Sequence, residues 1–426
     1  MKYRYHDQSL PLIIVIGGGF AGLELVKKLN NKPYRVLLLD KHNYFTFQPL
    51  LYQIAAGGLS ADSIAYPYRR KIGGYPNITF RMATVEQISP ELNTVHTNVG
   101  DFKYDHLIIA AGASTNFFNN SEIEKNTLPL KSIPDALDLR SFILQEFETA
   151  LVSENQQDQE KILNFIIVGG GPTGVELSGA LAEIKKNVIP SDYRELHKER
   201  MEVHLIEGSG RLLNGMSEKS SALAKKYLEK LGVKIMLNTF VKNYDGNELI
   251  LSDGKTIQTK NVIWTAGVKG ATINGIKPES ITKGNRYIVD GNNKLQGYEN
   301  IYAIGDISLM TTDAKYPTGH PGVAQVAIQQ AGNIADNFIR LAKNKSPQSF
   351  QYKNKGSMAT IGRHKAVVDL PFISFGGYLA WYIWMFVHLM TLVGFRNRFM
   401  VFINWMWNYF TYDRAIRLII RPFIKE

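Results

Sequence analysis

The most informative absence in this chain of 426 residues is cysteine, which does not occur at all. This absence excludes disulfide-stapled scaffolds, cysteine-ligated metal sites and redox-active dithiols. It leaves the compartment open, because a chain without thiols is compatible with any redox environment. The histidines show no metal-ligand spacing such as H-E-x-x-H, so we predict that the chain holds no metal.

Long, clean apolar runs are also scarce. The run "LPLIIVIGGG" near the start is too short for a signal peptide and leads into glycines, so it reads as a buried strand. Residues 370–395 carry no charge, and that length could span a bilayer. However, Pro371, Gly377 and His388 interrupt the segment, which leaves an apolar core of roughly 18 residues.

Acidic residues are rare in the last part of the chain. Residues 340–426 hold 13 Lys and Arg against 3 Asp and Glu, whereas the rest holds 36 against 35. Four of the five tryptophans lie in the same part. Basic residues around an uncharged, Trp-rich segment fit a membrane surface better than a nucleic acid, for which no recognised module is present.

The remaining sequence has globular composition and contains an internal duplication of one strand–helix–strand plan. The first copy has an apolar strand at 12–16, a helical pattern to about Leu29 and a second strand at 35–39. The second copy has a strand at 165–168, a glycine turn, a helix, and a later strand that ends at Glu207. This alternation predicts an α/β fold with two Rossmann-like domains.

Gly17, Gly19 and Gly22 form G-x-G-x-x-G directly between the first strand and its helix. Such glycines permit the tight turn, the approach of a pyrophosphate and close helix–strand packing, while the helix N-terminus attracts the phosphates. Asp40, at the end of the second strand, can accept hydrogen bonds from ribose hydroxyls. The alternative is a chance glycine-rich turn, which the correct strand, helix and terminal acid argue against.

Gly169, Gly171 and Gly174 repeat the motif, with Glu207 as the terminal acid. The register is less certain here because an extended helical segment separates the two strands. A carboxylate at this place repels a 2′-phosphate, so the pattern favours NAD over NADP, although Arg211 lies nearby. We call each glycine turn with its helix N-terminus and terminal acid a cradle. Two cradles on one chain indicate a bound flavin and a nicotinamide dinucleotide that binds transiently next to it.

A helical pattern is also predicted over 322–342, and the polar stretch 153–162 is predicted to be a surface connection. Gln325 and Gln329 stand four residues apart, on one face of the 322–342 helix. By spacing alone, two amides exposed to solvent remain the simpler interpretation. Asp306 ends the strand of "ENIYAIGD", where local sequence equally fits an ordinary Asx turn.

Together these segments resemble the two-dinucleotide-binding-domain flavoproteins and, within them, the type II NADH dehydrogenases, which are non-proton-pumping NADH:quinone oxidoreductases. The resemblance covers essentially the whole chain. The motifs that carry it are the two glycine motifs, "NYFTFQPLLYQIAAGGLS" (43–60), "AAGA" (110–113), "WTAGV" (264–268), "IYAIGD" (301–306), "AQVAIQQAG" (324–332) and the tail "GYLAWYIWMFVHLMTLVGFRNR" (377–398).

The resemblance implies non-covalent FAD, NADH as substrate, and a membrane quinone, either menaquinone or ubiquinone, as electron acceptor. It places Pro49 beside the flavin ring and the two glutamines, Gln325 and Gln329, at the quinone site. It also places Glu176 near the meeting point of nicotinamide, flavin and quinone, although a carboxylate complementing the helix dipole is the simpler reading. The further cofactor-binding residues that it implies are Lys41, Ala111, Gly112, Ala266, Gly267, Gly305, Asp306 and Ala324.

The tail is predicted to lie on a membrane as a monotopic anchor. Polar side chains recur on the segment after Arg396 at intervals of three, four or seven, which predicts one polar stripe on an apolar helix in the interface. A transmembrane span and a hydrophobic homodimer interface are the alternatives. The stripe consists of Asn397, Asn404, Asn408, Thr411, Arg414 and Arg421.

The sequence therefore predicts a peripheral enzyme on the cytoplasmic face of a bacterial inner membrane, bound through residues 370–426. A hydride would pass from NADH to FAD, and two electrons would then pass to quinone. The alternatives are a membrane-associated NAD(H)-binding sensor without turnover and a different FAD-dependent NAD(P)H oxidoreductase. The predicted domains are 1–118 and 291–345 for FAD, 119–290 for NADH and 346–426 for the membrane.

Overall fold

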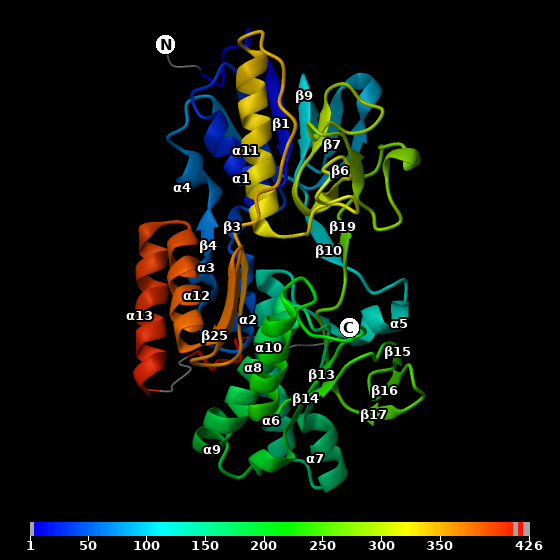
Figure 1. Cartoon of the computed structure of the whole chain (residues 1–426), viewed down its shortest axis with the longest axis vertical. Coiled ribbons are helices and arrows are strands. Elements are labelled where there is room, and N and C mark those ends of the chain that lie inside the picture. Colours follow the sequence, from blue (N-terminus) through cyan, green and yellow to red (C-terminus); the bar gives the residue numbers. More distant parts are fainter. Residues whose placement is uncertain (1–3, 412–415, 421–426) are drawn as a thin grey trace. The chain divides into compact units, whose positions relative to one another are not determined.

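The computed structural model describes residues 4–411 and 416–420, and it divides into two compact units (Figure 1). Unit 1 comprises Met1–Phe45, Tyr66–Ser114 and Val268–Asn354. Unit 2 comprises Thr46–Ala65, Thr115–Gly267 and Lys355–Glu426. The segment 46–65 and the tail thus group with the second dinucleotide-binding plan, a division that sequence periodicity does not reveal.

Unit 1 is built on a parallel five-stranded sheet with the order β21-β9-β1-β2-β5. The central strands are almost wholly buried, which is why they read as continuous apolar runs. Helices α1 and α11 pack against each other beside this sheet (Figure 1). The elements lying wholly in unit 1 are β1 (Leu12–Ile16), α1 (Phe20–Leu29), β2 (Arg35–Asp40), α4 (Tyr68–Ile72), β5 (Ile78–Met82), β6 (Val85–Ser89), β7 (Thr94–Thr97), β8 (Gly100–Lys103), β9 (His106–Ile109), β19 (Val268–Gly270), β20 (Tyr287–Val289), β21 (Ile301–Ala303), β22 (Ser308–Met310) and α11 (Ala324–Leu341).

Unit 2 repeats the plan with a second parallel sheet, in the order β11-β18-β12-β13-β14. A small antiparallel sheet, β23-β24-β25, and two helices near the C-terminus complete it. Its elements are α2 (Leu51–Ala55), α3 (Ala61–Ile64), α5 (Ser121–Asn126), β11 (Leu128–Pro129), α6 (Ile133–Leu151), α7 (Gln156–Leu163), β12 (Asn164–Val168), α8 (Pro172–Glu183), α9 (Ile189–Asp192), β13 (Glu202–Ile206), α10 (Glu218–Lys230), β14 (Lys234–Met236), β15 (Val241–Tyr244), β16 (Glu248–Leu251), β17 (Thr256–Gln258), β18 (Asn261–Trp264), β23 (Ser357–Thr360), β24 (Ala366–Leu370), β25 (Ile373–Gly377), α12 (Tyr378–Thr391) and α13 (Phe395–Thr411).

Three short strands lie where the chain passes between the units: β3 (Tyr44–Thr46), β4 (Ala65–Pro67) and β10 (Ala113–Thr115). The predicted helix over 322–342 is α11. The polar stretch 153–162 differs from the prediction, because most of it forms the helix α7 rather than a connecting loop. Asn155 caps that helix by accepting a hydrogen bond from Gln157 N, so the local polar residues start a helix there.

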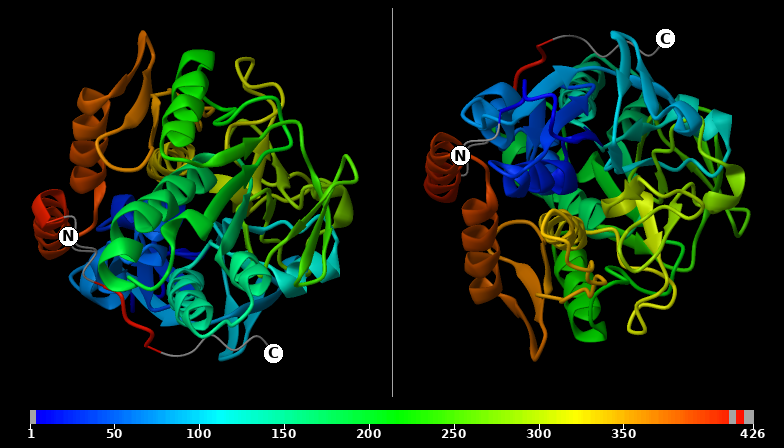
Figure 2. Two further views of the ribbon diagram at one scale, coloured as in Figure 1. Left: turned by 90° about the horizontal axis from the view of Figure 1, so that it is seen from below. Right: turned by 90° about the horizontal axis from the view of Figure 1, so that it is seen from above.

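The tail folds as the hairpin β24–β25 followed by α12 and α13, which lie side by side in both views of Figure 2. Two residues of the predicted polar stripe on α13 form hydrogen bonds within unit 2. Asn397 is buried and donates to the carbonyls of Asp62 and Ala65, and Asn408 donates to Gly58 O. These amides satisfy the ends of short helices in unit 2, so they bind protein instead of lipid.

Arg414 and Arg421 of the predicted stripe lie outside the described residues. The surface that α12 and α13 leave exposed is apolar instead, and we call it the tail face. Among the described residues, no helix has the length and apolarity needed to cross a membrane. The large hydrophobic side chains of the tail face are Tyr378, Leu379, Tyr382, Phe386, Met390, Phe395, Phe399, Met400, Phe402, Ile403, Trp407 and Phe410.

Candidate active site

The turn between β1 and α1 in unit 1 is shaped for a pyrophosphate. Gly17 has φ +95°, and a Cβ atom there would lie 2.4 Å from Ala110 O. A Cβ on Gly22 would lie 1.8 Å from Gly17 O, so helix and turn approach as closely as glycine allows. Gly19 faces open space and caps α1 without a side-chain hydrogen bond, which leaves the first N–H groups of the helix for an anion.

Asp40 closes this cradle from the end of β2. Its carboxylate accepts hydrogen bonds from Gly18 N at 2.7 Å and His42 N at 2.8 Å. The Tyr68 hydroxyl donates to it at 3.3 Å, and the next residue, Lys41, is exposed. The carboxylate is therefore fixed beside the glycine turn, where the adenosine ribose of a dinucleotide binds in this fold.

A second turn of unit 1 holds Asp306 at the end of β21. Gly305 has φ +76°, and its N–H donates to the buried Oε1 of Gln330 on α11 at 2.7 Å. Ser308 also contacts this amide, so Gln330 ties the Asp306 turn to the helix. The sequence analysis missed Gln330, although it stands inside the glutamine-rich motif. Ala111 and Gly112 form the turn after β9, where Gly112 has φ +73° and open space around it.

Gln325 and Gln329 lie in the first two turns of α11, which begins at Ala324. Both are partly buried. The Gln329 amide donates to Lys353 O at 2.9 Å and accepts from Lys353 N at 3.0 Å. Gln329 thus anchors the irregular segment around Lys353, and a role of the two glutamines at quinone stays a prediction.

Unit 2 repeats the cradle between β12 and α8. Gly169 has φ +110°, and a Cβ there would lie 2.7 Å from the backbone of Ala266. A Cβ on Gly174 would lie 1.9 Å from Gly169 O, whereas Gly171 faces open space and leaves the helix N-terminus without a side-chain cap. Gly267, beside Ala266, has φ +69°. These five residues lie together at one turn, and their role in binding a second dinucleotide stays a prediction.

Glu207 follows directly on β13, as the sequence analysis expected despite the long segment between the strands. It accepts hydrogen bonds from Gly170 N at 2.5 Å and Ser209 N at 2.8 Å. Arg211 bonds to Asn214 through Nε and Nη2. The carboxylate is therefore placed like Asp40 in unit 1.

Glu176 lies two residues after Gly174 and is buried in unit 2, with 7% of its surface exposed. Its Oε1 accepts a hydrogen bond from Thr360 N at 3.2 Å. Burial raises the pKa of the carboxyl group to about 8, against the opposing effects of the Thr360 N–H and the Trp384 indole. The Trp384 Nε1 is buried without a hydrogen-bond partner of good geometry among the described residues. The acid is thus predominantly protonated near neutral pH.

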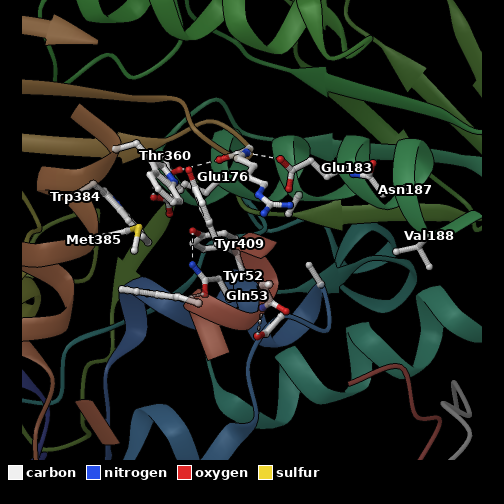
Figure 3. Close-up of a pocket in the computed structure, with 18 residues that line it drawn as sticks. Tyr52, Gln53, Glu176, Glu183, Asn187, Val188, Thr360, Trp384, Met385 and Tyr409 are labelled. Atoms are coloured by element: carbon white, nitrogen blue, oxygen red, sulfur yellow. Dashed lines mark hydrogen bonds between the residues drawn. The ribbon is translucent and has the colours of Figure 1, made fainter. Parts of the chain in front are cut away.

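Glu176 lines a cavity of about 130 Å³ within unit 2 (Figure 3). Figure 3 shows Glu176 and Glu183 of α8 above the cavity, Tyr52 and Gln53 of α2 below it, and Trp384 and Met385 of α12 at the left. Trp405 Nε1 donates to Gln53 Oε1 at 2.8 Å, and Trp384 stacks on His388 with ring centroids 4.2 Å apart. Burial lowers the pKa of His388 to about 4, so this imidazole, which stacks on Trp384, is uncharged near neutral pH.

Sequence patterns did not indicate most of this cavity. The tail tryptophans were predicted to lie at a membrane interface, whereas Trp381, Trp384 and Trp405 line the cavity. A sequence signal for this contact was the occurrence of two specific motifs in one chain, since Trp405 of the tail binds Gln53 of the 43–60 motif. The 43–60 motif also contains Pro49. Pro49 lies in unit 2, in a short 3-10 helix just before α2. The described residues contain no cluster of three or more potential metal ligands of the His, Cys, Asp or Glu type.

Two cradles of this design, each with its terminal carboxylate and its uncapped helix, define a flavoprotein of the two-dinucleotide-binding-domain class. The comparisons agree with this class. Residues 11–331 match the pyridine nucleotide-disulphide oxidoreductase family, and residues 354–412 match the NDH2 C-terminal domain.

Curated relatives narrow the class further. The chain is 35% identical over 410 residues to the type II NADH:quinone oxidoreductase NdhA of Mycobacterium tuberculosis, covering 92% of this chain and 86% of that one. It is 30% identical to an internal alternative NAD(P)H-ubiquinone oxidoreductase of Arabidopsis thaliana, covering 96% and 86%. The solved structure of NDH2 from Plasmodium falciparum in complex with NADH has the same fold, with a TM-score of 0.88, 24% identity and coverage of 96% and 100%.

The chain therefore belongs to the type II NADH:quinone oxidoreductases. The predicted α/β fold, the enzyme class, FAD as cofactor and NADH as substrate are confirmed. The sensor and the other FAD-dependent oxidoreductases are not favoured. The residues present fit FAD, since the open face at Gly19 and the free helix N-terminus are what a bound pyrophosphate requires.

Proposed function

We propose that unit 1 holds FAD, that unit 2 binds NADH, and that a quinone from the membrane enters the cavity over Glu176. Bound FAD would supply the redox chemistry, taking a hydride from NADH and returning two electrons to the quinone. The observation that carries the quinone assignment is the cavity itself. It combines an aromatic wall with the buried, protonated carboxyl group of Glu176, and Arg363 and Glu183 add charged side chains to its lining. Such a site suits a flat apolar ring with polar oxygens.

Glu176 would act on protons rather than on electrons. Quinone reduction consumes two protons, and a carboxyl group with a pKa of about 8 can donate one near neutral pH. The Thr360 N–H would hold the resulting carboxylate. Gln325 and Gln329 remain our candidates for further polar contacts to quinone, with Gln329 acting through the Lys353 segment that it anchors.

The tail face supports binding to a membrane surface. Its aromatic and aliphatic side chains are exposed on α12 and α13, and the same helices contribute to the cavity wall. A bilayer would cover this apolar surface and deliver a lipid-soluble quinone to the cavity. We place the enzyme on the cytoplasmic face of a bacterial inner membrane, with menaquinone or ubiquinone as the acceptor.

Stopped-flow absorbance in the flavin band tests the two half-reactions separately. NADH should bleach the band of the detergent-solubilised protein, and a short-chain quinone should restore it. Met385→Trp should fill the cavity and slow the recovery at least about tenfold, with bleaching unchanged, because overpacking excludes the ring.

Met385→Leu is the matched control, because it keeps the volume and polarity of the side chain. Equal recovery rates in the wild-type protein and both variants would contradict quinone entry through this cavity. Bleaching without recovery in the wild-type protein would contradict the quinone half of the proposal.

A further inference from the structure

A buried arginine in unit 2 has no partner that the structure shows. Arg140 lies on α6 with 3% of its surface exposed. Its Nε is buried without a hydrogen bond, and no ion pair or hydrogen bond joins its guanidinium to any residue in the described ranges. Burial lowers the pKa of Arg140, yet a guanidinium stays protonated in proteins. A buried cation without a counter-charge is strongly destabilising, so this site calls for an anion.

A second cavity of unit 2 provides space beside this guanidinium. It has a volume of about 20 Å³, and it is lined by Arg140, by Arg417 and by apolar side chains that include Ile143, Ile184 and Ile416. A space of this size admits one or two oxygen atoms, since a water-sized group needs roughly 10–15 Å³. The remainder of a larger anion would lie outside the cavity mouth.

The charged side chains that line this cavity, Arg140 and Arg417, are both positive. No acidic side chain lines it, and the second lining cation, Arg417, pairs through Nε with Asp192 at 2.6 Å. The cavity is separate from the one over Glu176, with which it shares Ala56 and Val188 in its walls. Arg140 therefore takes no part in the proposed redox chemistry.

We propose that Arg140 forms an anion subsite that binds a phosphate-type oxyanion, supplied by the headgroup of an anionic lipid or by free phosphate. A guanidinium binds such oxyanions through paired, charge-assisted hydrogen bonds. The apolar lining would meet the carbon part of a lipid. Leu418 and Ile420, just after Arg417, are 61% and 71% exposed, so an apolar surface continues next to the cavity along the chain.

Thermal unfolding of the full, FAD-loaded protein in detergent, followed by tryptophan fluorescence, tests this subsite. The probes are inorganic phosphate at constant ionic strength, and vesicles of phosphatidylglycerol and phosphatidylcholine compared with phosphatidylcholine alone. We expect a rise in Tm on the order of 2 °C with an anionic probe. The rise should disappear in Arg140→Met, whose unfolding without phosphate should occur at the same or a higher temperature, because the unpaired charge is gone.

Arg4→Met is the matched control, because Arg4 is exposed and lies in unit 1. A phosphate shift that Arg140→Met abolishes supports the subsite with free phosphate as ligand. A shift with phosphatidylglycerol vesicles alone, again abolished, supports a lipid headgroup. NADH oxidation with a water-soluble quinone should stay unchanged in both variants.

The proposal is overturned if neither probe raises Tm, or if Arg140→Met responds like the wild-type protein. It is also overturned if Arg4→Met loses the shift equally, because the effect would then be general charge. If Arg140→Met does not accumulate, Arg140→Lys replaces it. Lysine keeps the charge but cannot form the paired bonds, so the shift should fall by at least half, and an unchanged shift would contradict the proposal.

Discussion

At the scale of single residues, acidic side chains near the two glycine motifs serve different purposes, and the burial of each side chain decides which purpose it serves. Asp40 and Glu207 lie at strand ends, where main-chain N–H groups hold their carboxylates beside the glycine turns. Glu176 is also an acid close to a glycine motif, but it is buried against the aromatic tail. Burial disfavours the charged form of Glu176 and raises its pKa to about 8, so this carboxyl group can carry a proton near neutral pH.

The pH dependence of stability tests the burial of Glu176. Because its folded pKa of about 8 lies above the value of about 4.5 in the unfolded chain, the folded state binds more protons between these values. The free energy of unfolding should therefore fall as pH rises from about 4.5 to 8, by an amount on the order of 4–5 kcal/mol from this group. Glu176→Gln should remove that fall, as measured by chemical denaturation across this pH range.

The control for this prediction is Glu195→Gln, since Glu195 is exposed in the same unit. It should keep the wild-type pH dependence. A wild-type pH profile in Glu176→Gln would show that the carboxyl group ionises normally, and the proposed proton donor would lose its basis.

At the scale of elements, each strand–turn–helix unit uses its glycines for different reasons. Gly174 is needed because the helix backbone touches the turn, whereas Gly171 is needed to leave space outside. Within one motif, Gly174 therefore serves close packing, whereas Gly171, three residues earlier, serves ligand access. The same division holds for Gly22 and Gly19 in unit 1.

Alanine at the two positions of unit 2 should therefore give opposite phenotypes. Gly174→Ala places a Cβ 1.9 Å from Gly169 O, and backbone cannot yield cheaply, so Tm should fall by several degrees. Gly171→Ala meets no atom within 4 Å, so Tm should hold while the KM for NADH rises about tenfold or more through loss of phosphate access.

Differential scanning fluorimetry and steady-state kinetics on both variants check this pair. Flavin content should stay normal in Gly171→Ala, because the proposed FAD cradle is a separate element in unit 1. If Gly171→Ala lost stability but kept its KM, the assignment of this cradle to NADH would be wrong.

At the scale of the whole molecule, the tail face connects the fold to its surroundings. The exposed side chains of α12 and α13 form an apolar surface on a chain whose last part is strongly basic. On its inner side, α13 donates hydrogen bonds to the rest of unit 2 through Asn397, Asn408 and Trp405. The surface proposed to bind a membrane and the cavity wall thus belong to the same two helices.

Substituting the most exposed aromatics should detach the protein from membranes. Phe386, Phe395 and Phe410 are 64%, 82% and 70% exposed, so the triple change to serine should lower vesicle binding at least about tenfold without loss of the core. Co-sedimentation with anionic vesicles measures the effect. The control is Val152→Ser, which is 78% exposed outside the tail and should bind like the wild-type protein.

Unchanged sedimentation of the triple variant would contradict a membrane role for the tail face. A shift from dimer to monomer in the same variant, measured by analytical ultracentrifugation, would instead identify the tail face as a homodimer interface.

Local patterns in the sequence were enough to predict the two cradles. Continuous apolar strands, glycines at fixed spacing and a terminal acid act over about 30 residues, and β1, β2, β12 and α11 lie where these patterns put them. The family resemblance supplied FAD, NADH and quinone. The cradles and the cofactors could be predicted because short, contiguous stretches of sequence carry the motifs that indicate them.

Only the tertiary structure reveals the cavities and the contacts that the inner side of the tail helices makes with the rest of unit 2. Gln53, Glu176, Thr360 and Trp384 are far apart in the chain, and nothing local predicts that they line one space. Asn397 and Asn408 belong to a stripe with the period of an interfacial helix, and both donate to carbonyl groups of unit 2. The periodicity of polar residues along a helix determines which side chains share a face. What that face contacts depends on packing between segments far apart in the chain, which local sequence patterns do not reveal.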